Sequence, residues 1–439
     1  MREYFPGRTD RPVCRSLTLL ALLLLFASLL AGTSQQSVTN ADGSEDFVPG
    51  EVVVKLYKAG DLPTLAAQYS LNPTPLDQFG SRPIFRLRMI DNGSVPDRVD
   101  VLSHDSRVAF VEPNYVAKPP VGGGNTWSVG NTWSVGGDAG KFVAQWAPQK
   151  IHLSTAQQIN RGVGPNGPIK IAVLDTGVDT THPALVGHLL PGWDFVDNDS
   201  DPSEVGDQQT GPYGHGTHVA GLVTLIAPDA KIIPIRVLDK RGMGNIWVLA
   251  EALAFAVDPD GNPATADGAD VINLSLSTLR ETRLIRSLLE KACGGDSGSD
   301  MDLPISVNPY LVVVAAAGNG GNDTKQYPAA ENVDGLIAVA ASTMDDKLAT
   351  FSSRGSWVQV TAPGQGILST VPGGLYATWS GTSMAAPMVA GEAALVHARF
   401  PSLVNKDIAR QVERMSVNIS GDVPYRIDAG LALTSSSGH

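Results

Sequence analysis

Charged residues and cysteines are scarce in this chain of 439 residues. Lys, Arg, Asp and Glu make up only 17% of it, and two cysteines are present. So few cysteines exclude a disulfide-stapled scaffold and argue against a cysteine-based zinc site. Acidic residues outnumber basic ones by 44 to 32, which argues against nucleic-acid binding, because that function needs a basic patch. Hydrophobic residues reach 43%, enough to exclude a mostly disordered chain.

The amino terminus is typical of an export signal. Four arginines precede residues 17–31, which are almost wholly apolar. This apolar run is shorter than the roughly 20 residues that a spanning helix needs, so a cleaved signal over residues 1–34 is favoured over a permanent anchor. We therefore expect a secreted protein that meets a membrane only through this segment. Its removal takes Cys14 away and leaves Cys293 as a lone thiol.

Residues 46–118 have the pattern of a small α+β unit. Strand-like alternation and helical spacing follow one another along this unit. The strand-like runs are 47–56, 83–90 and 108–116, and the helical ones are 62–71 and 95–105. One sheet covered by two helices accounts for this order.

Residues 119–144 are predicted to be a flexible linker. They are rich in glycine and show neither strand nor helix periodicity. They contain the hexapeptide NTWSVG twice in tandem, at 125–136. Two copies are too few for a repeat architecture, so we interpret them as a duplication by replication slippage in a linker that tolerates insertions.

The remainder, 145–435, alternates short apolar runs with helical patterns. Such runs suit parallel strands buried on both faces. The fold class is therefore α/β, with three layers and a mainly parallel sheet between helices. The expected strands are 169–178, 230–238, 270–277, 310–319, 335–342 and 357–364, and the expected helices are 215–226, 245–257 and 284–292. In such sheets the active site gathers at the carboxyl ends of the strands.

Four polar residues stand at expected strand ends or helix starts. Asp175 ends a strand, His215 opens a helix and Ser383 lies in a glycine-flanked turn before a long helix. A serine nucleophile needs a base, and the base needs a partner that fixes its tautomer. Asn319 ends another strand, where its amide can donate to an oxyanion. Each residue alone is as well explained by a cap or loop, so the combination carries the prediction.

The sequence motifs around these residues resemble those of the subtilisin family of serine endopeptidases. They are DTGV (175–178), HGTHVAG (215–221), AAAGN (315–319) and GTSMAAP (381–387), in the order of that family. The resemblance implies that Asp175 orients His215, that His215 serves as base and then acid, that Ser383 attacks the peptide carbonyl, and that Asn319 completes the oxyanion hole. Two alternatives are an inactive subtilase used as a binding module and an esterase of another fold. Intact motifs argue against the first, and the chain order against the second.

The unit at 46–118 is similar to the propeptide of these enzymes. The resemblance implies a zymogen whose own propeptide acts as intramolecular chaperone and inhibitor until self-processing removes it, with cleavage in the linker. The alternative is a permanently attached accessory domain. Protein or peptide substrates, no organic cofactor and a monomer are expected.

Family members bind substrate as an added strand between two segments. Here Ser277-Thr278 replaces the glycines usual in the second segment, which is expected to narrow or polarise the pocket. A preference for apolar residues before the cut is the working expectation. The predicted substrate-binding residues are Gly242, Gly244, Ser275, Leu276, Ser277, Ala316 and Gly318.

Four aspartates crowd into one segment, and their charges repel unless a cation neutralises them. Oxygen ligands at alternate positions suit Ca²⁺, and the segment resembles a calcium loop of thermitase-like subtilases. A structural calcium ion is therefore predicted, the alternative being a solvated acidic loop. The predicted ligands are Asp194, Asp197, Asp199 and Asp201. The calcium site that many bacterial subtilisins hold near their N-terminus is expected to be absent, because Ala184 stands where a carboxylate is needed. A polar insertion at 293–309 is expected to be a surface loop.

Overall fold

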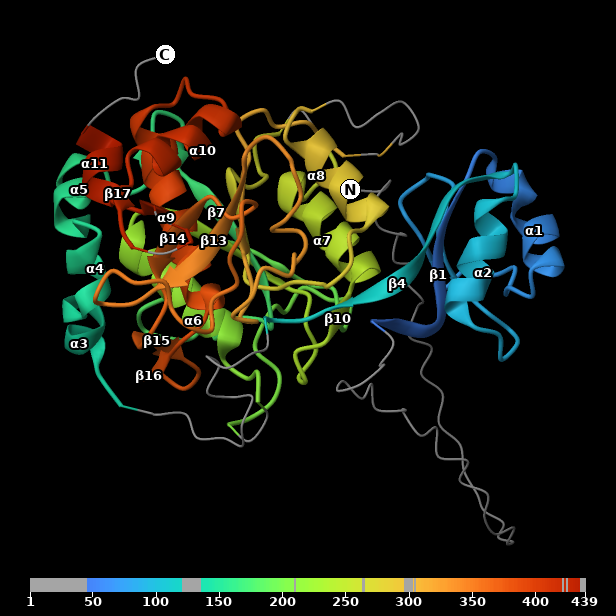
Figure 1. The fold of residues 1–439 in the computed structure, drawn as a ribbon, viewed down its shortest axis with the longest axis horizontal. Helices are drawn as coiled ribbons and strands as arrows, with labels where there is room; N and C mark the ends of the chain where they lie inside the picture. Colours follow the sequence, from blue (N-terminus) through green and yellow to red (C-terminus); the bar gives the residue numbers. More distant parts are fainter. Residues whose placement is uncertain are drawn as a thin grey trace, which may run out of the picture.

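A computed structural model describes residues 46–120, 136–208, 211–262, 265–295, 303, 305–420, 422–423 and 425–434. The predicted signal segment and most of the tandem repeat lie outside these ranges. Within them, a small domain stands beside a larger one (Figure 1). No helix in the described ranges is long and apolar enough to cross a membrane.

The small domain is one antiparallel sheet covered by two helices, as predicted. Its elements are β1 (Phe47–Leu56), η1 (Ala59–Asp61), α1 (Leu62–Gln68), β2 (Asp77–Gln78), β3 (Ile84–Arg88), α2 (Val95–Ser103) and β4 (Val108–Ala117). β1 lies between β3 and β4. The sheet continues into the large domain, because β4 also pairs with β10 (Gly244–Asn245). The two domains therefore share a sheet.

The large domain is built on a nine-stranded sheet in the order β17-β18-β14-β13-β12-β11-β7-β9-β8. The strands from β7 to β14 pair in parallel, and the antiparallel pair is β17 with β18. Their bounds are β7 (Lys170–Asp175), β8 (Trp193–Asp194), β9 (Lys231–Arg236), β11 (Val271–Leu274), β12 (Val312–Ala316), β13 (Leu336–Ser342), β14 (Val360–Pro363), β17 (Val417–Asn418) and β18 (Tyr425–Arg426). The predicted mainly parallel sheet is confirmed.

Alternate residues of β7 feed two separate cores. Ile171 and Val173 pack on one face with helices α6 and α9, whereas Ala172 and Leu174 pack on the other with α7 and α8. Side chains alternate across a strand, so both faces are buried and three layers result, as predicted. The helices are α3 (Ala139–Ala144), α4 (Trp146–Lys150), α5 (Leu153–Ile159), α6 (His215–Ile226), α7 (Ile246–Val257), α8 (Arg283–Ala292), α9 (Thr382–Arg399), α10 (Asn405–Arg414) and α11 (Ala429–Thr434).

Two parts of the large domain differ from the sequence-based expectation. Residues 139–144, assigned to the linker, form α3, whose Phe142 is buried in the core. A hairpin that sequence reasoning missed joins β15 (Ile367–Val371) to β16 (Leu375–Trp379). A smaller ribbon joins β5 (Val163–Gly164) to β6 (Gly167–Pro168).

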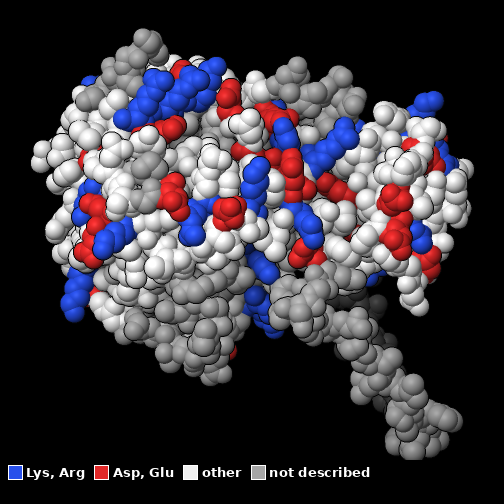
Figure 2. All heavy atoms as spheres, viewed as in Figure 1, with Lys and Arg blue, Asp and Glu red and all other residues white. Residues whose placement is uncertain are grey.

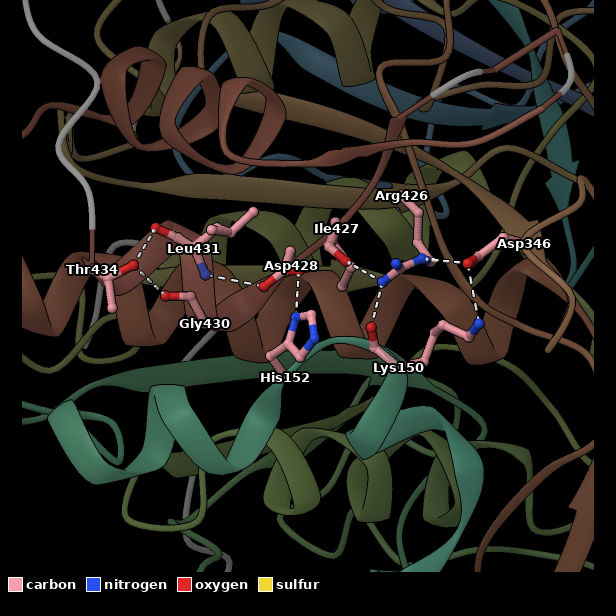
Figure 3. A network of polar contacts seen from close by, with 9 residues as sticks. All are labelled: Lys150, His152, Asp346, Arg426, Ile427, Asp428, Gly430, Leu431 and Thr434. Atoms are coloured by element: carbon pink, nitrogen blue, oxygen red, sulfur yellow. Dashed lines mark hydrogen bonds and ion pairs between the residues drawn. The ribbon is translucent and has the colours of Figure 1, made fainter.

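Polar contacts tie the beginning of the large domain to its end (Figure 3). Asp346 bonds Lys150 at 3.1 Å and Arg426 at 2.7 Å, and Arg426 also donates to the carbonyl of Lys150 at 2.6 Å. His152 meets the buried carboxylate of Asp428 at 2.6 Å. Segments more than 270 residues apart are thereby fixed on one side of the sheet.

Candidate active site

An aspartate and a histidine meet at the carboxyl edge of the sheet. Asp175 ends β7 and His215 begins α6, and both are buried. His215 Nδ1 donates to Asp175 Oδ1 at 2.6 Å, while the backbone N–H of Thr176 donates to the same oxygen at 2.8 Å. Because Nδ1 carries this proton, Nε2 of a neutral His215 is the basic nitrogen.

Ser383 lies at the start of α9, which packs directly against α6. Its Oγ lies 3.3 Å from the carbonyl oxygen of Ser275, and Ser275 Oγ donates to the carbonyl of Ser383 at 3.0 Å. Ser275 is itself fixed by the amide of Asn273, at 3.0 Å. The end of β11 thus positions the serine.

The amide of Asn319 has a defined orientation. Its Oδ1 accepts from the backbone N–H of Thr382 at 2.9 Å and from the Thr382 hydroxyl at 3.0 Å. A backbone N–H only donates, so the atom facing it must be the oxygen. Nδ2 therefore points the other way, where it donates to the carbonyl oxygen of Pro120 at 2.8 Å.

The chain leading to Pro120 runs as an added strand between the two predicted substrate segments. Ala117 at the end of β4 pairs with Gly244. On the other side, Lys118 and Ser277 exchange two backbone hydrogen bonds, of 3.0 and 2.8 Å. A Cβ on Gly242 would lie 3.5 Å from Cδ of Pro119. The site therefore holds a peptide from its own chain by β-augmentation.

The other predicted binding residues occupy different places. Leu276 is buried in the core beneath the sheet, and Ala316 packs in the opposite core. Gly318 lies beside a residue that sequence reasoning missed, Gln326. A Cβ on Gly318 would come within 2.4 Å of Gln326 Cδ, and Gln326 Oε1 accepts from Ser277 Oγ at 2.7 Å. The buried Gln326 amide thus lies against both Ser277 and Gly318.

A second residue that sequence reasoning missed, Glu204, binds the residues that flank Asp175 and His215. Its Oε1 accepts from the hydroxyls of Thr176 and Thr217 and from the Thr217 N–H, each at 3.1 Å. These threonines lie next to the catalytic-site carboxylate and in the first turn of α6. Burial raises the pKa of Glu204 to about 7, against the effect of the N–H donors.

Strand β4 of the small domain caps two helices of the large one. Glu112 accepts from the N–H groups of Arg283 and Leu284, at 2.8 and 3.1 Å, at the start of α8. Asn114 accepts from the N–H of Trp247 in the first turn of α7, at 3.3 Å. The first N–H groups of a helix have no partner within it, so β4 completes both helices. Neither cap is visible in the sequence pattern.

The acidic segment predicted to bind calcium has a cation of its own. Arg236 on β9 is within 2.5 Å of Asp194 and 2.6 Å of Asp197, and it is almost fully buried. Asp199 and Asp201 accept backbone donors two residues further on, at 2.8 and 3.2 Å. Arg236 therefore supplies part of the neutralisation that the sequence argument assigned to an ion.

Acidic and basic side chains also gather at the junction of the domains (Figure 2). There Arg280 of the large domain pairs with Asp46 of the small one at 3.0 Å.

Two family models match this chain. A model described as "Subtilase family" matches residues 167–426, and one described as "Fervidolysin N-terminal prodomain" matches residues 33–114. The thermophilic serine proteinase of Bacillus sp. (strain AK1) is 34% identical over 437 residues, which cover 95% of this chain and 96% of that protein. Thermitase of Thermoactinomyces vulgaris is 40% identical over 291 residues, 64% of this chain and 91% of that protein.

The fold has a solved counterpart. Fervidolysin from Fervidobacterium pennivorans, described as a keratinolytic enzyme related to subtilisin, aligns with a TM-score of 0.67 at 24% identity. The alignment covers 90% of this chain and 62% of that chain. The likeness is one of fold, and it includes the small domain as well as the large one.

Proposed function

This chain belongs to the subtilase family of serine proteases, and we propose that it is a secreted endopeptidase made as a self-processing zymogen. Ser383 is the nucleophile, His215 the general base and then acid, and Asp175 the residue that holds the imidazole. The amide of Asn319 and the backbone N–H of Ser383 receive the oxyanion. The apolar segment at 17–31 supports secretion.

The contact between Asn319 and the Pro120 carbonyl carries the proposal. An oxyanion donor bound to one particular carbonyl marks that carbonyl as the one attacked. The bond cut in processing is therefore Pro120–Val121. Ser383 Oγ adds to the carbonyl carbon as His215 takes its proton, and collapse breaks the C–N bond as His215 protonates the leaving nitrogen of Val121. Water then hydrolyses the acyl-enzyme and regenerates Ser383.

External substrates are peptides that enter as an extended strand where residues 117–119 now lie. Gln326 fills space between Ser277 and Gly318, so we infer that the residue before the cut is small. This replaces the broad apolar preference expected from sequence with a narrower one. The strand pairing supplies affinity that does not depend on side chains.

N-terminal sequencing of the purified active form tests the proposal directly. We expect the mature chain to begin at Val121 and Ser383 to be labelled by a fluorophosphonate probe. The Ser383→Ala variant should remain unprocessed. A mature end within the NTWSVG repeat would refute the Pro120–Val121 assignment, and normal processing of Ser383→Ala would show that another protease cuts the chain.

A structural calcium ion in the Asp194–Asp201 loop is part of the proposal. Such an ion would have to share Asp194 and Asp197 with Arg236. Asp199→Asn and Asp201→Asn should then lower the calcium-dependent part of thermal stability. An EDTA-induced fall in midpoint that is the same in parent and variants would place the ion elsewhere.

A further inference from the structure

The loop between α7 and β11 gathers three aspartates. Asp258 follows directly on α7, and Asp260 and Asp267 come from the two described arms of the loop. Each of the three places one carboxylate oxygen within 4.8 Å of the others. We propose that these aspartates form a calcium site, separate from the acidic segment at 194–201 and from the active site.

Asp258 supplies the observation that points to a ligand. It is 7% exposed, and its Oδ2 accepts from the hydroxyl of Ser306. Its Oδ1 is shielded from solvent and has no hydrogen-bond donor among the described residues. A buried carboxylate oxygen without a partner is costly. A cation shared with the neighbouring carboxylates removes that cost.

The surrounding hydrogen bonds fix the conformation of the loop. Asp260 Oδ1 accepts from the N–H of Asn262 at 2.8 Å and from the hydroxyl of Thr265 at 2.9 Å. Thr265 also reaches Asp267 Oδ1 at 3.3 Å. The nearby ammonium of Lys170 is bonded to the carbonyl of Ala266. These bonds hold the carboxylates close together although their negative charges repel one another.

The donor chemistry selects calcium over other metals. The group contains carboxylate oxygens and neither histidine nor cysteine, which disfavours zinc. Asp258, Asp260 and Asn262 stand at alternate positions of one turn, the spacing by which flexible loops present oxygens to Ca²⁺. Mg²⁺ demands stricter octahedral geometry and keeps more of its water. The loop precedes the first residue of β11, whereas the active site lies at the carboxyl ends of the strands, so the ion is structural.

Equilibrium dialysis of the purified protein against ⁴⁵Ca²⁺ tests the site. Parent and variants carry Ser383→Ala to prevent self-digestion, and calcium is set at the concentration that just saturates the parent. Asp258→Asn and Asp267→Asn should each bind one ion fewer, with affinity weakened at least tenfold. Asp345→Asn, which removes an exposed charge elsewhere, should bind as the parent does.

Thermal midpoints with and without calcium provide a second readout. Added calcium should raise the midpoint of the parent and of Asp345→Asn more than that of the loop variants. If Asp258→Asn fails to fold, Asp267→Asn decides alone, because Asp267 is only half-buried. Equal ion counts in parent and Asp267→Asn, or no bound ion in the parent, would overturn the proposal. Neither result depends on protease activity.

Discussion

Glu112 allows a test of how tightly the small domain binds the large domain, because the charge of its carboxyl depends on pH. In the complex its carboxyl is buried against the start of α8, and this burial raises its pKa from an ordinary 4.5 to about 7. The backbone N–H groups of Arg283 and Leu284 pull the pKa down, but less strongly. Burial therefore outweighs the two hydrogen bonds, and the complex holds the Glu112 proton more tightly than the free domain does.

The sign of the pH dependence follows from linkage. A carboxyl whose pKa is raised on binding favours the complex fully below its free pKa, and this contribution is lost as pH rises towards about 7. The gap between the free and bound pKa values is worth about 3 kcal/mol, on the order of a few hundredfold in affinity. Inhibition by the small domain should weaken from pH 4.5 to pH 7 and then level off.

Two substitutions separate charge from capping. Glu112→Gln keeps an acceptor oxygen but does not titrate. Inhibition by this variant domain should therefore not weaken between pH 4.5 and pH 7, and at pH 8 the variant should inhibit more strongly than the parent. Glu112→Ala also leaves both N–H groups unpaired, which should cost about 1.5 kcal/mol, on the order of tenfold, relative to Gln. The assay is inhibition of processed enzyme by added domain 46–120 across this pH range. An unchanged pH dependence in Glu112→Gln would refute the reasoning.

Three further changes probe the site and the core. Asn319→Ala should lower kcat about 10²–10³-fold with little effect on KM, since it removes one oxyanion donor; a loss confined to KM would contradict this role. Gln326→Gly should raise kcat/KM for peptides with phenylalanine before the cut relative to alanine by at least about tenfold, and an unchanged ratio would show that Gln326 does not limit the pocket. Glu392 on α9 is fully buried, neither of its carboxylate oxygens has a hydrogen-bond donor within the described part of the chain, and burial raises its pKa. Glu392→Leu should therefore raise stability at pH 8 by about 1–3 kcal/mol, with less effect near pH 4, and calorimetry showing a lower midpoint at pH 8 would contradict this.

The parts of the site that lie on regular elements could be predicted from sequence. Asp175 ends a buried strand, Asn319 comes shortly after the end of another at Ala316, and His215 begins a helix. Parallel strands place such ends at one edge of the sheet, so local patterns were enough to bring these residues together. The same reasoning applies to the three layers, because continuous apolar runs indicate burial on both faces.

Residues that act through distant packing could not be predicted in this way. Gln326 lies in an irregular segment and meets Ser277, 49 positions earlier. Glu112 acquires its role only when β4 docks on α8, 171 positions away. The acidic segment at 194–201 is a further case, because Arg236, about 40 positions away, supplies positive charge that no local pattern reveals.

The two prolines before the proposed cut would allow the small domain to be both substrate and inhibitor. Strand pairing with the large domain ends at Lys118, because Pro119 and Pro120 have no N–H to donate. The Pro120 carbonyl is therefore held by the Asn319 amide on one side and by the pairing of residues 116–118 on the other. Cleavage at Pro120 would free the linker but break none of these contacts, nor the caps that Glu112 and Asn114 provide. The processed domain should consequently stay bound and keep the site closed until it is itself degraded.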